Sequence, residues 1–262
     1  METFQAISQF YENYDEDGRL TSRHGAVEFL STVRYVEQYL RPGMRILEIG
    51  AGTGRYSHYF ARNGYRVDAV ELVEHNIEIF RANTQPGESI TIVQGNALDL
   101  GDFCDNAYDI TLLLGPMDHL FSEEGKLQAL GEAIRVTKSG GVICVAYCGN
   151  DATILQFCFA RGMLKDERYQ QLVDPVTFKA GSDPLELFEL HRPEEIEALR
   201  AHFPVTPLHL VASDGAARYL RPVLEEMDEE LYQQYLQYHF ATCERRDMLG
   251  YSNHYLDIFR KD

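Results

Sequence analysis

Apolar residues recur along this chain in two spacings, and the two spacings alternate through most of its length. Short apolar runs bounded by glycine, proline or asparagine predict strands, and apolar residues three or four apart predict helices. The nearly all-apolar run at 108–114 is typical of a parallel strand buried at the centre of a sheet. Strands are expected at 44–49, 66–71, 90–94, 108–114, 142–147, 205–212 and 254–260. Helices are expected at 3–13, 22–40, from the first strand's end to about 63, and at 74–83, 122–137, 151–164, 193–203 and 223–241.

The alternation of strands with helices through short turns predicts an α/β fold. Its sheet should be doubly wound and parallel, with helices on both faces. The alternation falters after the strand at 142–147, and residues 165–185 show no regular pattern. No internal repeat and no glycine-, proline- or serine-rich linker divides the chain, so residues 1–262 are expected to form a single domain.

Charge and cysteine content count against some classes of protein. The net charge of −17 argues against a nucleic-acid partner, because phosphate backbones require a basic face. Five cysteines without a C-x-x-C pair indicate reduced thiols, and neither a disulfide framework nor a metal site is expected. The chain begins without a signal-peptide pattern, and no apolar run approaches the ~18 residues of a membrane span. We therefore expect a cytoplasmic protein that does not enter membranes.

A glycine-rich turn follows the first predicted strand, in the segment Met-Arg-Ile-Leu-Glu-Ile-Gly-Ala-Gly-Thr-Gly at 44–54. Glycine allows a sharp strand-to-helix turn and lets backbone amides approach a ligand. Glu71 ends the next strand, 21 residues after Gly50. Nucleotide-binding α/β folds place the carboxylate that holds the ribose at a spacing of about 20 residues. The dinucleotide fingerprint G-x-G-x-x-G would need glycine at Arg55, so a dehydrogenase is disfavoured.

The acid Glu48 followed by G-x-G-x-G resembles motif I of the class I S-adenosylmethionine (SAM)-dependent methyltransferases, and the resemblance extends from about residue 44 to 147. It implies a Rossmann-like sheet of seven strands, mostly parallel, with the last strand antiparallel. It also implies helical cap elements at about 1–40, 150–192 and 212–252. The implied reaction transfers a methyl group from SAM to a small-molecule acceptor and leaves S-adenosylhomocysteine (SAH).

The resemblance also assigns cofactor-binding residues. The glycine turn would line the methionine half of SAM, with Glu48 either at the amino end or paired with a local donor. Glu71 would hold the ribose, and the turn after the third strand would hold adenine, with Asn96 where the family usually has aspartate. The N-terminal segment would close over SAM, where Arg23 could meet the carboxylate or be a solvated helix start. The full expected set is Tyr14, Arg23, Glu48, Gly50, Ala51, Gly52, Gly54, Glu71, Leu72, Asn96, Ala97, Leu98 and Leu114.

The exit from the fourth strand, Leu-Gly-Pro-Met-Asp-His at 114–119, would lie beside the methyl group. It carries neither the Pro-Pro-aromatic signature of amino-methylating enzymes nor the Pro-Cys nucleophile of cytosine C5 enzymes. His119 is the candidate general base, because an imidazole titrates near neutral pH. Asp118 could orient it or bind substrate. The alternative for His119 is packing against the next helix, and a base is needed only where the acceptor must lose a proton.

Other functions stay open at this point. The chain could bind SAM as a regulatory module without turnover, or it could methylate a protein or RNA through a local basic groove. The methylated atom could be nitrogen, oxygen, sulfur or carbon. A tyrosine stripe, Tyr232, Tyr235 and Tyr238, could wall a substrate pocket, although such a stripe is more often core packing.

Overall fold

The computed structural model describes residues 2–182 and 188–262. Its centre is an eight-stranded mixed sheet in which seven strands follow the order β3-β2-β1-β4-β5-β8-β7, and the short β6 pairs with β5. The strands are β1 Arg45–Ile49, β2 Arg66–Glu71, β3 Ile90–Gln94, β4 Tyr108–Leu113, β5 Thr137–Gly149, β6 Leu190–His191, β7 Val205–Ala212 and β8 His254–Lys261. The predicted α/β class is confirmed.

The strands from β3 to β5 are parallel, and β8 runs antiparallel to both of its neighbours. The expected antiparallel last strand is therefore confirmed, and β6 is an addition to the expected seven. Because β8 runs against β5, the first residue of β8 lies beside the last residues of β5. His254 is in register with Cys148 at that edge.

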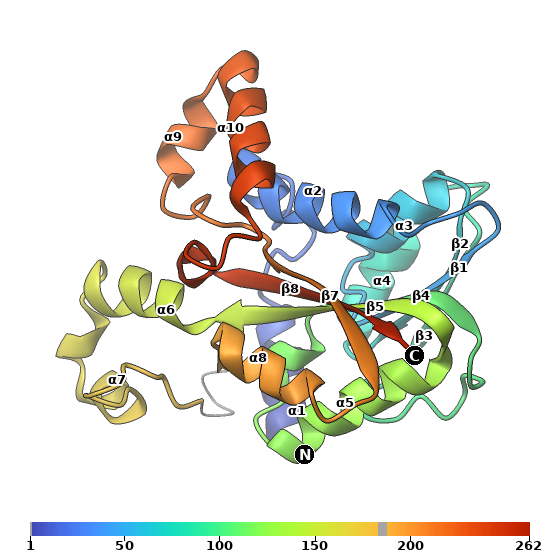
Figure 1. Ribbon diagram of the computed structural model, residues 1–262, viewed down its shortest axis with the longest axis horizontal. Helices are drawn as coiled ribbons and strands as arrows, with labels where there is room; N and C mark the ends of the chain where they lie inside the picture. The colour runs from blue at the N-terminus through green and yellow to red at the C-terminus, as the bar shows by residue number, and fades with distance from the viewer. Residues whose placement is uncertain (1, 183–187) are drawn as a thin grey trace.

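Helices cover both faces of the sheet (Figure 1). On one face lie α2 (Arg23–Glu37) and α3 (Arg55–Arg62), and on the other lie α5 (Glu123–Val136) and α8 (Pro193–Arg200). The helix α4 (Glu74–Asn83) packs against β2 and β3. The predicted start of α5 is confirmed, since the Ser122 hydroxyl accepts the Gly125 amide at 3.1 Å.

The additional segments gather at the edge where β5 ends (Figure 1). The first helix, α1, packs beside α4. Two helices predicted as continuous are each interrupted. The first becomes α6 followed by a π-helical turn, and the second is broken before Asp228, whose carboxylate accepts the Leu231 amide and so caps a new helix. The bounds are α1 Glu2–Tyr11, α6 Asn150–Thr153, η2 Ile154–Phe159, η3 Met163–Lys165, α7 Glu167–Leu172, α9 Arg221–Glu226, α10 Glu229–Thr242 and η4 Leu249–Tyr251.

Within the described ranges, no helix has both the length and the apolar character needed to cross a bilayer. All five cysteines are unpaired, and only Cys104 is exposed. Tyr232 and Leu236 of α10 pack against Val27 of α2 in a separate apolar cluster, so this part of the tyrosine stripe is core packing.

Candidate functional site

A cavity of about 480 Å³ opens at the carboxyl edge of the sheet. Its walls come from the glycine turn, the exit of β4, the N-terminal segment, the insert after β5 and the start of β8. The volume lies within the ~300–1,000 Å³ that is typical of small-molecule sites. Ligands of open α/β sheets bind at this edge.

The glycine turn forms the floor of this cavity through Gly50, Ala51 and Gly52. Gly50, Gly52 and Gly54 have φ of +79°, +54° and +91°, which only glycine adopts readily. A Cβ on Gly50 would lie 2.5 Å from Pro116 Cδ, and one on Gly54 would lie 2.4 Å from Phe80 Cδ2. These two glycines are therefore required by the protein's own packing. At Gly52 the nearest atom is Glu16 Cγ, at 3.4 Å, so this residue has the most open approach of the three.

Glu71 is 6% exposed and binds the glycine turn directly. One carboxylate oxygen accepts the Gly52 amide and the other accepts the Val73 amide, both at 2.8 Å. A carboxylate has about four acceptor positions, so it can take further donors. Glu71 thus holds the turn in shape and keeps capacity for a ligand's hydroxyl groups.

Glu48 lies in β1 and is 1% exposed, yet it lines the cavity. The Ser57 hydroxyl donates a hydrogen bond to its carboxylate. Burial raises the pKa of Glu48 to about 8 despite that hydrogen bond. At neutral pH the side chain is therefore protonated, and a cation placed beside it would drive off the proton.

The structure brings only part of the expected residue set to the cavity. Arg23 instead pairs with Glu229 at 3.2 Å and lies over the Tyr232 ring. Asn96 is a turn residue whose side-chain oxygen accepts the Leu98 amide at 3.0 Å. The expected residues that line the cavity are Tyr14, Glu48, Gly50, Ala51, Gly52, Leu114 and Asp118. Those that do not are Arg23, Gly54, Glu71, Leu72, Asn96, Ala97, Leu98 and His119.

The two candidate catalytic residues occupy different surroundings. The ring of His119 packs between aromatic groups: its Nε2 lies 3.0 Å from the Tyr11 hydroxyl, and its centroid is 5.3 Å from that of Phe188. The carboxylate of Asp118 lines the cavity and accepts the Cys148 amide at 2.8 Å. Burial raises the pKa of Asp118. Of the pair, Asp118 lines the cavity and His119 does not.

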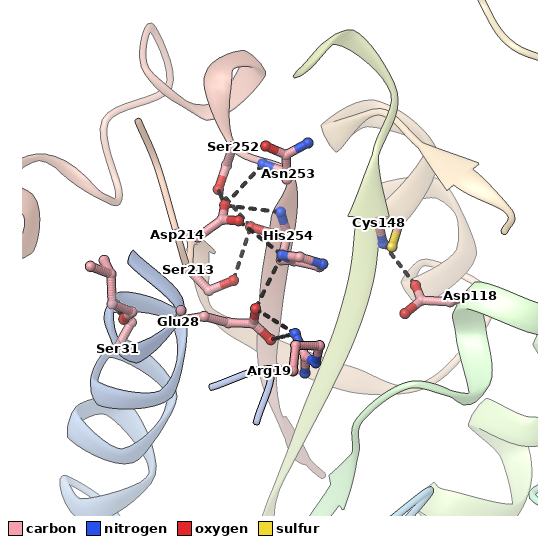
Figure 2. Close-up of polar contacts among 12 residues, drawn as sticks. Arg19, Glu28, Ser31, Asp118, Cys148, Ser213, Asp214, Ser252, Asn253 and His254 are labelled. Atoms are coloured by element: carbon pink, nitrogen blue, oxygen red, sulfur yellow. Dashed lines mark hydrogen bonds and ion pairs between the residues drawn. The ribbon is translucent and has the colours of Figure 1, made fainter. Parts of the chain in front are cut away.

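A polar cluster that sequence reasoning missed lies opposite Asp118 (Figure 2) and lines the cavity through Arg19, Glu28 and His254. His254 Nδ1 lies 2.9 Å from Asp214 Oδ2 and 3.2 Å from Glu28 Oε2. Arg19 contacts the Glu28 carboxylate at 2.8 Å. We call Arg19, Glu28, Asp214 and His254 the histidine cluster.

Several donors fix Asp214 in place. Its Oδ1 accepts the Ser252 hydroxyl at 2.6 Å and the amides of Asn253 and His254 at 2.9 and 3.1 Å. Burial alone would raise the pKa of Asp214, but His254 and these donors hold it below its usual range. Burial alone would lower the pKa of His254, but the carboxylates of Glu28 and Asp214 outweigh it and raise that pKa.

The histidine cluster escaped sequence reasoning because its four members come from four separate segments, with no local spacing to connect them. One signal was present. An antiparallel last strand starts at the edge where parallel strands end, so its first residue should reach a site at that edge. His254 is that residue.

The remaining wall is apolar and comes largely from the insert after β5, through Ile154, Phe157, Met163, Leu172, Val173 and Phe188. Arg218 also lines the cavity, and its side chain is exposed. In the part of the chain that the structure describes, no carboxylate forms an ion pair with Arg218. We call this part of the cavity the apolar chamber, and Arg218 lies at its rim.

Comparison with known proteins identifies the fold's relatives. Residues 47–145 match a family model described as "Methyltransferase domain". The chain is 33% identical over 106 residues to an S-adenosyl-L-methionine-dependent Diels-Alderase, iccD, of Talaromyces variabilis. It is 28% identical over 141 residues to a ubiquinone biosynthesis O-methyltransferase of Methylocella silvestris. Among solved structures, magnesium protoporphyrin IX methyltransferase from Synechocystis with bound SAH aligns with a TM-score of 0.56 at 13% identity, covering 95% of this chain and 88% of that one.

The matches to curated relatives are partial. They cover 39% of this chain and 35% of the Diels-Alderase, and 54% of this chain and 53% of the O-methyltransferase. The chain therefore spans about a third to a half of the length of these relatives. The family model covers the part of the sheet from β1 to β5 with its glycine turn, and β7, β8 and much of the cavity wall lie outside it.

Proposed function

We propose that this chain is a class I SAM-dependent methyltransferase and that it transfers the methyl group of SAM to a small-molecule acceptor. One observation carries the proposal. The glycine turn and the exit of β4 form one side of a cavity whose other side is an apolar chamber. A donor and an acceptor can therefore lie end to end in one enclosed space.

The residues at the turn fit SAM. The Gly52 backbone has no Cβ toward the cavity, and Glu71, beside it, has acceptor capacity for ribose hydroxyls. Glu48 and the turn would hold the methionine end, and Glu71 the ribose. When bound, SAM supplies a methyl group already activated on a sulfonium.

The chain's own contribution is to place the acceptor and exclude water. Holding two reactants in line can supply roughly 7–11 kcal/mol of barrier reduction. The apolar wall from the insert after β5 favours an acceptor with an apolar body. The guanidinium of Arg218 at the rim favours an anionic group on that acceptor.

A second candidate is SAM-dependent cyclisation without methyl transfer. The likeness to the Diels-Alderase favours it, and the apolar chamber suits a folded polyene. Incubation with SAM that carries a trideuterated methyl group separates the two. Mass spectrometry should find the label on a product and unlabelled SAH; a rearranged product of unchanged mass would favour cyclisation.

Glu71→Ala should weaken SAM binding about 10- to 100-fold, because hydrogen bonds to a charged group contribute ~1.5–3 kcal/mol each. Calorimetry with SAM and with SAH measures the loss. The control is Glu74→Ala, which removes a solvent-exposed acid three residues along and should leave the affinity unchanged. Equal affinity in both variants would contradict the ribose assignment, and no binding of SAM by the unmodified protein would end the proposal.

SAM binding should release close to one proton near neutral pH, and Glu48→Gln should abolish the release. The pKa of Glu48 is about 8 in the free protein, so the side chain is protonated there. The ammonium of SAM beside it favours the ionised form and lowers that pKa. Affinity should therefore rise with pH and fall as the solution becomes more acidic. Calorimetry in buffers of different ionisation enthalpy counts the protons, and an unchanged count in Glu48→Gln would place the ammonium elsewhere.

A further inference from the structure

We propose that His254 is the catalytic base that takes the proton from a hydroxyl or ammonium group of the methyl acceptor, acting through Nε2. Asp214 and Glu28 are its positioning residues. The inference rests on the proposed methyl transfer and adds to it the residue that makes a protonated acceptor nucleophilic.

The hydrogen bonds of the ring define which nitrogen can act. Nδ1 faces two carboxylates, Asp214 Oδ2 at 2.9 Å and Glu28 Oε2 at 3.2 Å, so it carries a proton. In the neutral ring Nε2 then holds the free lone pair. Figure 2 shows this second nitrogen directed away from Asp214 and Glu28, toward the side where Cys148 and Asp118 lie. Nε2 has no hydrogen-bond partner within residues 2–182 and 188–262, and His254 lines the cavity.

The position of His254 relative to the expected methyl group of SAM also fits the role of a base. The exit of β4 lines the same cavity through Leu114, Gly115 and Asp118. Asp118 accepts the amide of Cys148, which is the register partner of His254 across the β5–β8 pair. An acceptor lying between β8 and the β4 exit thus has His254 on one side and the expected methyl position on the other. His119, by contrast, does not line the cavity.

Charged groups from each neighbouring element face His254. Glu28 comes from α2, Asp214 from the turn after β7, Arg19 from the N-terminal segment and Asp118 from the exit of β4. The Cys148 thiol lies beside it on β5, and burial raises the pKa of that thiol. The two carboxylates raise the pKa of His254, and Arg19 acts in the opposite direction. The neutral ring that serves as base therefore forms as the pH rises.

The step balances without another reactant. An electron pair on the acceptor oxygen or nitrogen forms the bond to the methyl carbon. The carbon–sulfur bond breaks, and its electron pair stays on sulfur. The proton of the acceptor passes to His254 Nε2, and the imidazolium formed is stabilised by Asp214 and Glu28 before it releases the proton to water.

The same geometry could be taken for a metal site, because Glu28, Asp214 and His254 offer ligand atoms within 4.8 Å of one another. The donor set argues for a histidine pair instead. Arg19 already binds the Glu28 carboxylate, and a hydroxyl and two amides occupy Asp214 Oδ1. Methyl transfer that survives treatment with EDTA supports the inference, and activity lost to EDTA and restored by a divalent metal overturns it.

The main test compares two acceptors that differ in whether they need a base. The probes are para-hydroxyphenylacetate, whose phenol is un-ionised at about pH 8, and para-mercaptophenylacetate, whose thiol is ionised there. Both carry a carboxylate to meet Arg218. His254→Ala should lower kcat about 100- to 10,000-fold with the phenol. With the thiol, kcat should stay within about threefold, since no proton must be removed. Unchanged SAM affinity in calorimetry shows that the variant is folded.

Other outcomes separate this inference from the proposed function. Equal loss with both probes, or no loss with the phenol, overturns the role of His254 as base. Transfer by the unmodified protein to the thiol alone also overturns it and leaves methyl transfer standing. Transfer to neither probe, with SAM bound, counts against the proposed function and takes this inference with it.

A pH profile supplies a readout that a structural role would not move. The value of kcat/KM with the phenol should rise with pH as His254 loses its proton, and then level off. Glu28→Gln removes one of the carboxylates that raise the pKa of His254, so the rise should shift to lower pH. Glu37→Gln changes an exposed acid on the same helix and should leave the profile in place. A profile that does not move in Glu28→Gln, or that falls with pH in the unmodified protein, contradicts the assignment.

Discussion

Gly50→Ala should weaken SAM binding roughly 100-fold and lower the melting temperature, whereas Gly64→Ala should leave SAM binding unchanged. Both glycines have positive φ, +79° and +86°, so both substitutions bear the same left-handed strain of ~1–2 kcal/mol. Only the substitution at Gly50 adds a steric clash. Its Cβ would lie 2.5 Å from Pro116 Cδ and 2.6 Å from the Leu114 carbonyl oxygen, but a Cβ at Gly64 meets nothing within 4 Å.

The collision must move either the glycine turn or the exit of β4, because a proline ring and a backbone carbonyl cannot rotate away. Both segments line the cavity, so either movement displaces one wall of the proposed SAM site. Thermal unfolding and calorimetry on the two variants separate general strain from loss of the site. Wild-type SAM affinity in Gly50→Ala would show that the cofactor does not depend on this contact.

Arg200→Leu should lower the free energy of unfolding by about 3–5 kcal/mol, because it leaves a buried carboxylate without its partner. Arg200, in the last turn of α8, is ion-paired with Asp257 in the middle of β8, and Asp257 is 0% exposed. The control is Arg246→Leu. Arg246 has a largely exposed side chain and pairs with Glu197, so its loss should cost no more than ~1 kcal/mol.

The effect should depend on pH in a defined direction. Burial raises the pKa of Asp257 to about 7, with Arg200 opposing the shift. A carboxyl whose folded pKa exceeds its unfolded value of ~3.9 favours folding at low pH and loses that contribution as pH rises. Without Arg200 the pKa rises further, so the loss extends to higher pH. Urea unfolding across pH checks this, and adding Asp257→Asn should remove the pH dependence; a variant as stable as Arg246→Leu would contradict the pairing.

The sequence predicted the fold closely where local chemistry decides it. The strands at 66–71, 90–94 and 205–212 have the predicted bounds, since each is an apolar run between breakers. The predictions of one continuous helix at 151–164 and another at 223–241 were wrong, because each segment is interrupted. The first passes into a π-helical turn, and in the second the capping carboxylate of Asp228 starts a new helix. The spacing of apolar residues predicts the apolar face of a helix, but it does not predict where the pattern of backbone hydrogen bonds changes.

In the candidate site, too, the sequence predicted the contacts between neighbouring elements but not those between distant segments. The glycine turn and Glu71 are separated by a single helix–strand unit. Their spacing along the chain therefore predicted that they belong to one site. His254 reaches Glu28 and Asp214 because β8 lies between β5 and β7, and no spacing in the sequence predicts that contact. His119 has the imidazole expected of a general base, but Tyr11 and Phe188 pack against its ring. A residue type indicates what a side chain can do, and the tertiary fold decides whether it faces the cavity.

The place of β8 between β5 and β7 has a consequence for biosynthesis. Both neighbours precede β8 in the chain, so a growing polypeptide holds two unpaired sheet edges until β8 arrives. The part of the sheet that carries the glycine turn can fold on the ribosome before β8, which carries His254, has been synthesised. The nascent chain would thus acquire the means to bind its methyl donor before it acquires the means to use it.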